Sequence, residues 1–119
     1  MYRLTREFYF SASHMIHNLE NSQPESRLHG HNYRVKVEIK VTNANKIGFP
    51  EKEHQIFDKI KTWIEDELAT RHLNDIFGGM SPTSENICHW LFFAFKGMFS
   101  DISAVELSEG QGINCRYEE

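Results

Sequence analysis

The segment 31–42 alternates strictly between apolar and polar residues, and this alternation constrains the fold more than any other feature of the sequence. The apolar set comprises Tyr33, Val35, Val37, Ile39 and Val41, and the polar set comprises Asn32, Arg34, Lys36, Glu38, Lys40 and Thr42. Successive side chains of a strand point to opposite faces of its sheet. The segment is therefore predicted to be a strand of an antiparallel sheet, with one covered face and one wetter face.

A second strand is predicted over residues 2–12, where Leu4, Phe8, Phe10 and Ala12 share one parity. Residues 17–28 are polar and rich in turn-forming residues, which predicts a loop. Two further short strands are predicted near 101–108 and 113–118. Together these segments give a sheet of four strands.

Two helices are predicted between the strands. Apolar residues recur at helical spacing over 52–69, and the run Gly78-Gly79-Met80-Ser81-Pro82 ends this first helical region. Thr83 is the expected N-cap of a second helix reaching about Phe99, since a threonine oxygen can accept a hydrogen bond from a free N–H of the first turn. Its predicted buried stripe is Ile87, Trp90, Leu91, Ala94, Phe95 and Met98.

This order of elements predicts an α+β fold in which the helices cover one face of an antiparallel sheet. The 119 residues are expected to form a single domain over 1–119, because a chain of this length holds one core. Short edge strands expose unpaired backbone groups, so pairing between subunits into a homo-oligomer is expected.

Composition and charge argue against several classes of protein. No run approaches the ~20 apolar residues of a membrane span, and the first ten residues lack the apolar core of a signal peptide. A net charge of −4 argues against a nucleic-acid binder, which normally carries a basic surface. Cys88 and Cys115 have no CxxC spacing and are too few for a disulfide framework. A cytoplasmic protein without nucleic-acid or membrane partners is expected.

The placement of the histidines indicates a metal site. His29 and His31 are two residues apart at the start of the best strand, so both side chains would lie on one face. His14 ends the first strand and would come opposite His31 if the two strands form a hairpin. Three histidines with one open position are typical of catalytic zinc. The alternative is that the His-Gly-His pair is merely structural.

The other histidines are predicted to lie on the surface or on a helix face: His17, His54, His72 and His89. His17 is close enough in sequence to the cluster to serve as a spare ligand.

Five segments resemble the 6-pyruvoyl-tetrahydropterin synthase family, which includes the 6-carboxy-tetrahydropterin synthases of the queuosine pathway. They are Phe10-Ser11-Ala12-Ser13-His14, Leu28-His29-Gly30-His31-Asn32-Tyr33, Leu73-Asn74-Asp75-Ile76 with Pro82-Thr83-Ser84-Glu85, and Ser108-Glu109. The resemblance runs in order along nearly the whole chain. It implies a tunnelling-fold subunit whose trimers form a barrel and usually pair into hexamers, with the site at a subunit interface.

The resemblance also implies roles for individual residues. Zn²⁺ would be held by His14, His29 and His31. Glu109 would anchor the pterin ring, and Thr83 would contribute to substrate binding. The implied substrate is 7,8-dihydroneopterin triphosphate.

The sequence departs from the family pattern at the catalytic residues. Glu25 stands where the family has its catalytic cysteine, and Ala69 and Thr70 stand where it has a supporting Asp-His pair. His72 lies two residues out of register with that histidine, and Gly48 replaces the aspartate of an Ile-Asp-Phe element. A carboxylate is already ionised at neutral pH, so Glu25 could act as a base without the Asp-His pair. It could equally be a solvated loop residue.

Three functions therefore remain open. The chain could be a zinc-dependent lyase of the 6-carboxy-tetrahydropterin synthase type. It could use Glu25 to release 6-hydroxymethyl-dihydropterin, a folate precursor, as some glutamate-bearing family members are associated with doing. It could also be a non-catalytic paralogue that binds zinc and a pterin.

Overall fold

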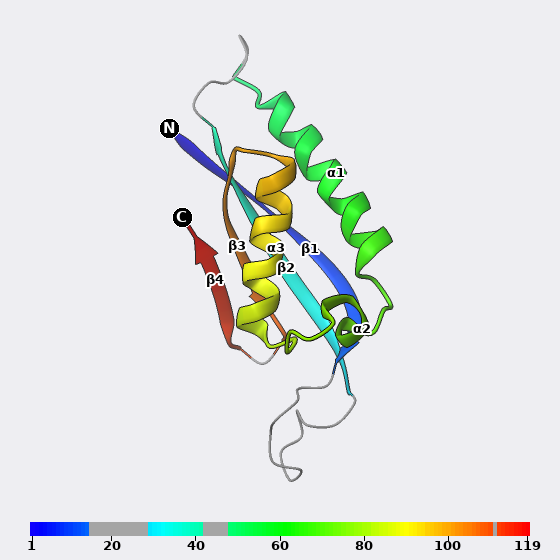
Figure 1. Cartoon of the computed structure of the whole chain (residues 1–119). Coiled ribbons are helices and arrows are strands. Elements are labelled where there is room, and N and C mark those ends of the chain that lie inside the picture. Colours follow the sequence, from blue (N-terminus) through cyan, green and yellow to red (C-terminus); the bar gives the residue numbers. More distant parts are fainter. Residues whose placement is uncertain (15–28, 42–47, 111) are drawn as a thin grey trace.

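A computed structural model describes residues 1–14, 29–41, 48–110 and 112–119. Its sheet contains β1 (Tyr2–His14), β2 (His29–Val41), β3 (Ile102–Ser108) and β4 (Asn114–Glu118), in that spatial order (Figure 1). All three neighbouring pairs are antiparallel, which confirms the predicted sheet. The edges are β1, which is 13 residues long and thus not a short edge strand, and the five-residue β4. The predicted loop at 17–28 lies outside the described residues.

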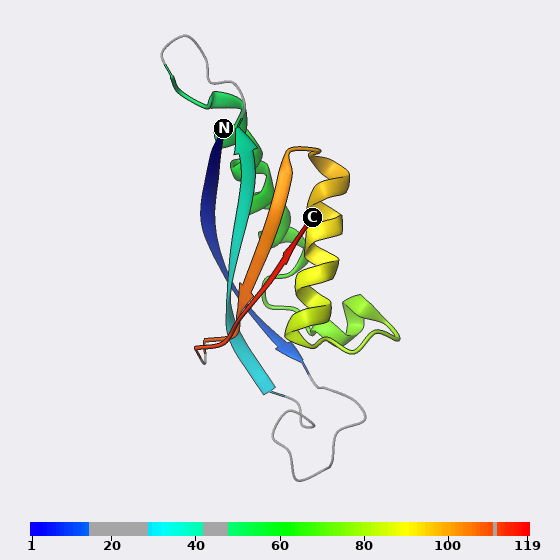
Figure 2. The same ribbon diagram turned by 90° about the vertical axis from the view of Figure 1, so that its left-hand side faces the viewer.

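The helices cover one face of this sheet (Figure 2). They are α1 (Glu51–Glu67), α2 (Leu73–Phe77) and α3 (Ser84–Met98). The two long helices match the prediction to within two residues at each end. The sequence pattern missed α2, because a five-residue helix is too short to show a helical period. None of the described helices is long and apolar enough to cross a membrane.

The core lies between the sheet and the helices. The apolar face of β2 is buried along its whole length, as its alternation predicted. The predicted stripe of α3 is correct at Ile87, Leu91 and Phe95 but wrong at Met98, which is 42% exposed. Cys88 and Phe92 are buried instead. The buried face is rotated because α3 packs on β4 as well as β3, with the rings of Phe92 and Tyr117 4.9 Å apart.

The start of α3 is fixed by the predicted cap. Thr83 Oγ1 accepts a hydrogen bond from the backbone N–H of Asn86 at 3.2 Å. This cap satisfies one of the free N–H groups of the first turn. It thereby fixes the position of the segment 82–84, which leads into the site described below.

The open face of the sheet carries a buried carboxylate. Glu38 is only 7% exposed and accepts hydrogen bonds from Arg116 Nη2 and Ser103 Oγ, each at 2.8 Å. Arg3 Nε lies 3.3 Å from the same carboxylate. Burial by itself raises the pKa of Glu38, but the hydrogen bonds from Arg116 and Ser103 and the charges of Arg116 and Arg3 hold it below its usual range.

A pKa that is lowered in the folded state stabilises the fold at neutral pH. Replacing Glu38 with glutamine should therefore lower the free energy of unfolding by about 1–3 kcal/mol at pH 7. The difference should shrink as the pH falls below the carboxyl's usual pKa of 4.5 and through its lower folded value. Urea unfolding across this range measures it. Glu118, an exposed partner of the same arginine, is the control, and Glu118→Gln should change little.

Candidate functional site

The site forms where β1 and β2 meet at one end of the sheet. The register pairs His14 with His29 and Ala12 with His31. The prediction that His14 faces His31 directly is therefore wrong by two residues, because the ladder continues past His31 to His29. A shift of two residues keeps the same face of the sheet. The backbone consequently places residues 14, 29 and 31 on one face, although the side chain of His29 lies outside the described part of the structure.

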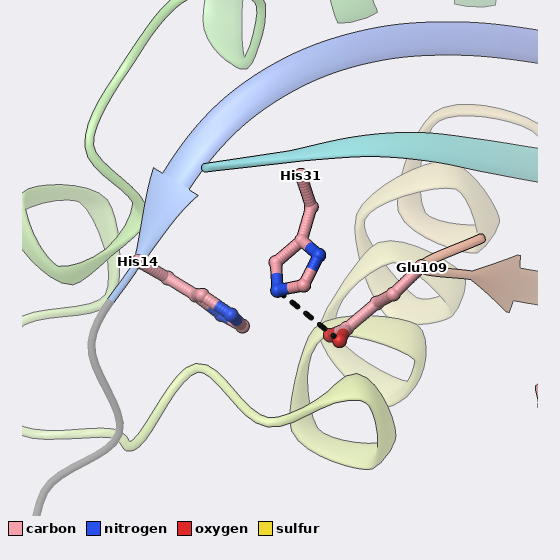
Figure 3. A group of neighbouring side chains, drawn as sticks. All are labelled: His14, His31 and Glu109. Atoms are coloured by element: carbon pink, nitrogen blue, oxygen red, sulfur yellow. Dashed lines mark ion pairs between the residues drawn. The ribbon is translucent and has the colours of Figure 1, made fainter. Parts of the chain in front are cut away.

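Three side chains from different strands converge there (Figure 3). His14 comes from the end of β1, His31 from β2 and Glu109 from the residue after β3. The rings of His14 and His31 are perpendicular, with centroids 4.8 Å apart. Glu109 Oε2 lies 3.6 Å from His31 Nε2. One ligand atom from each of the three lies within 4.8 Å of the others.

The tautomer of His14 is set by a backbone carbonyl. Its Nδ1 lies 2.9 Å from the carbonyl oxygen of Pro82, and a carbonyl oxygen can only accept a hydrogen bond. Nδ1 therefore carries the proton, which leaves the lone pair on Nε2. Tyr33 Oη lies 3.2 Å from the same Nδ1 and helps to enclose the fully buried ring. A histidine that donates one ring N–H to a fixed acceptor is the usual support for a metal ligand.

Glu109 is held from the other side by the start of α3. Ser84 Oγ donates a hydrogen bond of 2.7 Å to Glu109 Oε1. This contact leaves Oε2 directed toward His31. Ser84 thus limits the rotation of the carboxylate and determines which oxygen faces the histidines.

This donor set suits a divalent transition metal. Imidazole nitrogens and a carboxylate oxygen are ordinary zinc ligands, and tetrahedral coordination would bring neighbouring ligand atoms to about 3.4 Å from one another. The described cluster is somewhat wider than this, so it would need a small closure of side chains on binding. The fixed tautomer of His14 and the backbone position of His29 both fit a zinc site.

The segment before α2 runs beside β1. The Thr70 N–H donates to the Ser11 carbonyl at 2.6 Å, and the Ser13 N–H donates to the Arg71 carbonyl at 3.0 Å. Thr70 has a φ of 60°, an unfavourable conformation for a β-branched residue. It helps to line an open cavity of about 340 Å³ that also reaches Ser13, Gly30 and His31.

The sequence pattern predicted that His72 lies on the surface or on a helix face, but the structure places it elsewhere. It is half-buried, and its Nδ1 lies 3.0 Å from Ser13 Oγ. His54 and His89 are exposed, as predicted. His17 lies outside the described residues.

The sequence matches the model of the 6-pyruvoyl tetrahydropterin synthase family over residues 3–119. The chain belongs to this family. It is 33% identical to a 6-carboxy-5,6,7,8-tetrahydropterin synthase of Synechocystis over 97 residues, which cover 77% of this chain and 73% of that protein. The family assignment thus agrees with the resemblance seen in the sequence motifs.

Solved structures show the same fold. The 6-pyruvoyl tetrahydropterin synthase of Caenorhabditis elegans superimposes with a TM-score of 0.85 at 22% identity, covering 99% of this chain and 95% of that one. A Plasmodium vivax 6-pyruvoyltetrahydropterin synthase, in a variant whose catalytic glutamate is replaced by alanine, gives a TM-score of 0.68 at 12% identity, covering 99% and 97%. The four-stranded sheet with helices on one face is therefore the fold of this family.

Several site residues emerged only with the structure. The sequence predicts Tyr33 only as part of the apolar face of its strand and Ser84 only as part of a family motif. In the structure Tyr33 contacts His14, and Ser84 contacts Glu109. Glu109 was expected to bind a pterin, and its proximity to His31 was not foreseen. Glu25 lies outside the described residues, so its role stays a prediction.

Proposed function

We propose that this family member is a zinc-dependent lyase that acts on 7,8-dihydroneopterin triphosphate, of the 6-carboxy-tetrahydropterin synthase type in the queuosine pathway. The convergence of His14, His31 and Glu109 carries this proposal. The two histidines would then bind the metal, and the adjacent Glu109 would accept hydrogen bonds from the substrate. The relative from Synechocystis, which bears the 6-carboxy-tetrahydropterin synthase name, supports the choice of product.

In this proposal His14, His29 and His31 hold Zn²⁺. The metal would supply Lewis-acid polarisation of a substrate side-chain oxygen. The Pro82 carbonyl keeps the His14 ring in the tautomer that leaves Nε2 for a metal, and Tyr33 lies against the same Nδ1. With His29 as the third ligand, Glu109 is not needed by the metal and can accept hydrogen bonds from the pterin, because a carboxylate can bind a pair of N–H donors and fix their orientation. Thr83, as the cap of α3, positions the segment that faces the pterin.

The anchoring role of Glu109 predicts a graded loss of pterin affinity. Glu109→Gln should weaken binding of a dihydropterin about 100-fold, since it removes a charge-assisted pair of hydrogen bonds. Ser84→Ala should weaken it only about 5- to 10-fold, because the carboxylate remains but loses its restraint. Calorimetric titration measures both. Glu106, a carboxylate on the neighbouring strand β3, is the matched control, and an equal loss in Glu106→Gln would contradict the assignment.

A second function is the release of 6-hydroxymethyl-dihydropterin with Glu25 as the base. The absence of a cysteine at position 25 favours it. The Plasmodium vivax relative offers a parallel, since its catalytic residue is a glutamate. In this version Glu25 takes a proton from a side-chain hydroxyl of the substrate, and the adjacent carbon–carbon bond breaks. An aldehyde that carries the triphosphate leaves, and the carbon that stays on the pterin takes up a proton.

Incubation of the zinc-loaded protein with 7,8-dihydroneopterin triphosphate, followed by product identification by mass, tests these functions. A carboxy-tetrahydropterin supports the first and a hydroxymethyl-dihydropterin the second. Unchanged substrate with zinc bound would overturn both and favour a non-catalytic zinc- and pterin-binding paralogue.

We further propose that the chain works as a homo-oligomer, a trimer or a hexamer, with its site at a subunit interface. Within the described chain, β1 and β4 are the edges of the sheet, and each has one side without a strand partner. Exposed Tyr2 and Tyr9 lie on β1. Light scattering at micromolar concentration should give three or six subunits, and a monomer would contradict the proposal.

A further inference from the structure

The two cysteines of the chain meet between α3 and β4. Cys88 is fully buried on α3, and its Sγ lies 3.2 Å from the Val105 carbonyl and 3.3 Å from the Cys115 carbonyl. Cys115 is therefore a residue of β4 that the Cys88 thiol contacts, through its backbone carbonyl. Both are free thiols. These residues are 27 positions apart, so the contact is made by the fold.

We propose that Cys88 and Cys115 are a redox-responsive pair that closes to a disulfide between α3 and β4 when the protein meets a peroxide. The Cys115 sulfur attacks one peroxide oxygen, the O–O bond breaks, and one water leaves with a thiol proton. The Cys88 sulfur then attacks the resulting sulfenic acid, the S–S bond forms, and a second water leaves. Two thiols are oxidised, and one hydrogen peroxide is reduced to two waters.

The order of these steps follows from burial. Cys115 is only half-buried, so an oxidant reaches it first. Burial raises the pKa of both thiols, and that of Cys88 to about 12, so the buried Cys88 is the poorer first nucleophile. Its Sγ nevertheless lies 3.3 Å from the Cys115 backbone carbonyl, so Cys88 is the thiol placed to resolve the sulfenic acid.

The pair lies one helical turn from the Glu109 contact. Ser84 precedes Cys88 by four residues on α3, so both side chains lie on the same face of the helix. Ser84 binds Glu109 just before the β3–β4 turn, and Cys88 contacts β4 just after it. A disulfide would therefore fix this turn to α3 on both sides. In a reducing cell such a bond would form only transiently, which suits a redox-sensing role.

Oxidation of the full-length protein with hydrogen peroxide tests this proposal. After denaturation and treatment with N-ethylmaleimide, the oxidised protein should carry no maleimide, and its intact mass should be lower by two hydrogens. Dithiothreitol should reverse both changes. The oxidised protein should melt several degrees above the reduced protein.

Cys115→Ser is the control, since it leaves the buried Cys88 in place. It should keep one maleimide-reactive thiol after oxidation and show no rise in melting temperature. Two alkylated cysteines, a persistent sulfinic acid at Cys115, or a crosslink between chains in the wild-type protein would each overturn the proposal. The mass measurement needs no pterin or metal, so its outcome is independent of the proposed function.

Discussion

Replacing His31 with alanine should abolish zinc retention and turnover. His31 faces both His14 and Glu109, so its loss removes the central member of the cluster. The affinity for zinc should fall more than about 100-fold, because loss of a direct ligand exceeds the 10- to 100-fold cost of losing an outer-shell partner. Metal analysis after dialysis against a weak chelator measures zinc per chain. His29→Ala should behave in the same way.

His54→Ala is the matched control for this experiment. It also removes one imidazole, but His54 is exposed on α1 and stacks on Phe49 with centroids 4.7 Å apart. This variant should keep its full zinc content and its activity. Stoichiometric zinc in a folded His31→Ala protein would refute the metal assignment, and circular dichroism establishes whether each variant is folded.

The sequence predicted the fold well because the spacing of apolar residues reflects which side of each strand or helix is buried. The alternation in β2 and the helical spacing in α1 both reflect a single covered face, and both elements were placed to within two residues. The pattern was wrong about the buried face of α3, because this helix packs against two strands, β3 and β4. The buried face of α3 includes Phe92 because β4 packs there, and this long-range contact leaves no trace in local spacing.

The site was predicted less completely, for a related reason. The motif around His29 and His31 is local, so it was recognisable, whereas the register with His14 depends on how far the ladder extends. The contact of Ser84 with Glu109 joins residues 25 positions apart and follows from the packing of α3 against the β3–β4 turn. No local pattern in a single sequence predicts a contact between residues so far apart in the chain.

The missing Asp-His pair bears on which residue could act as the general base. Ala69 and Thr70 occupy those positions, and neither side chain can relay a proton as an aspartate and a histidine would. The Thr70 N–H is committed to the Ser11 carbonyl, and its hydroxyl donates to the Ala69 carbonyl at 2.7 Å. A cysteine at position 25 would lack that support, whereas a carboxylate, with a usual pKa near 4.3, would not need it.

Glu25→Gln should therefore lower kcat about 10²- to 10⁴-fold, the usual contribution of a general base. Zinc content and pterin affinity should stay unchanged, because the amide keeps the size of the side chain and Glu25 is not among the proposed ligands. Glu25→Cys should be as inactive as Glu25→Gln, because the new cysteine would lack a supporting Asp-His pair. Glu20→Gln, another carboxylate of the same polar segment, is the control and should retain activity. An unchanged rate in Glu25→Gln would assign the proton transfer to another group, and His72, whose Nδ1 lies 3.0 Å from Ser13 Oγ, would then be the next to replace.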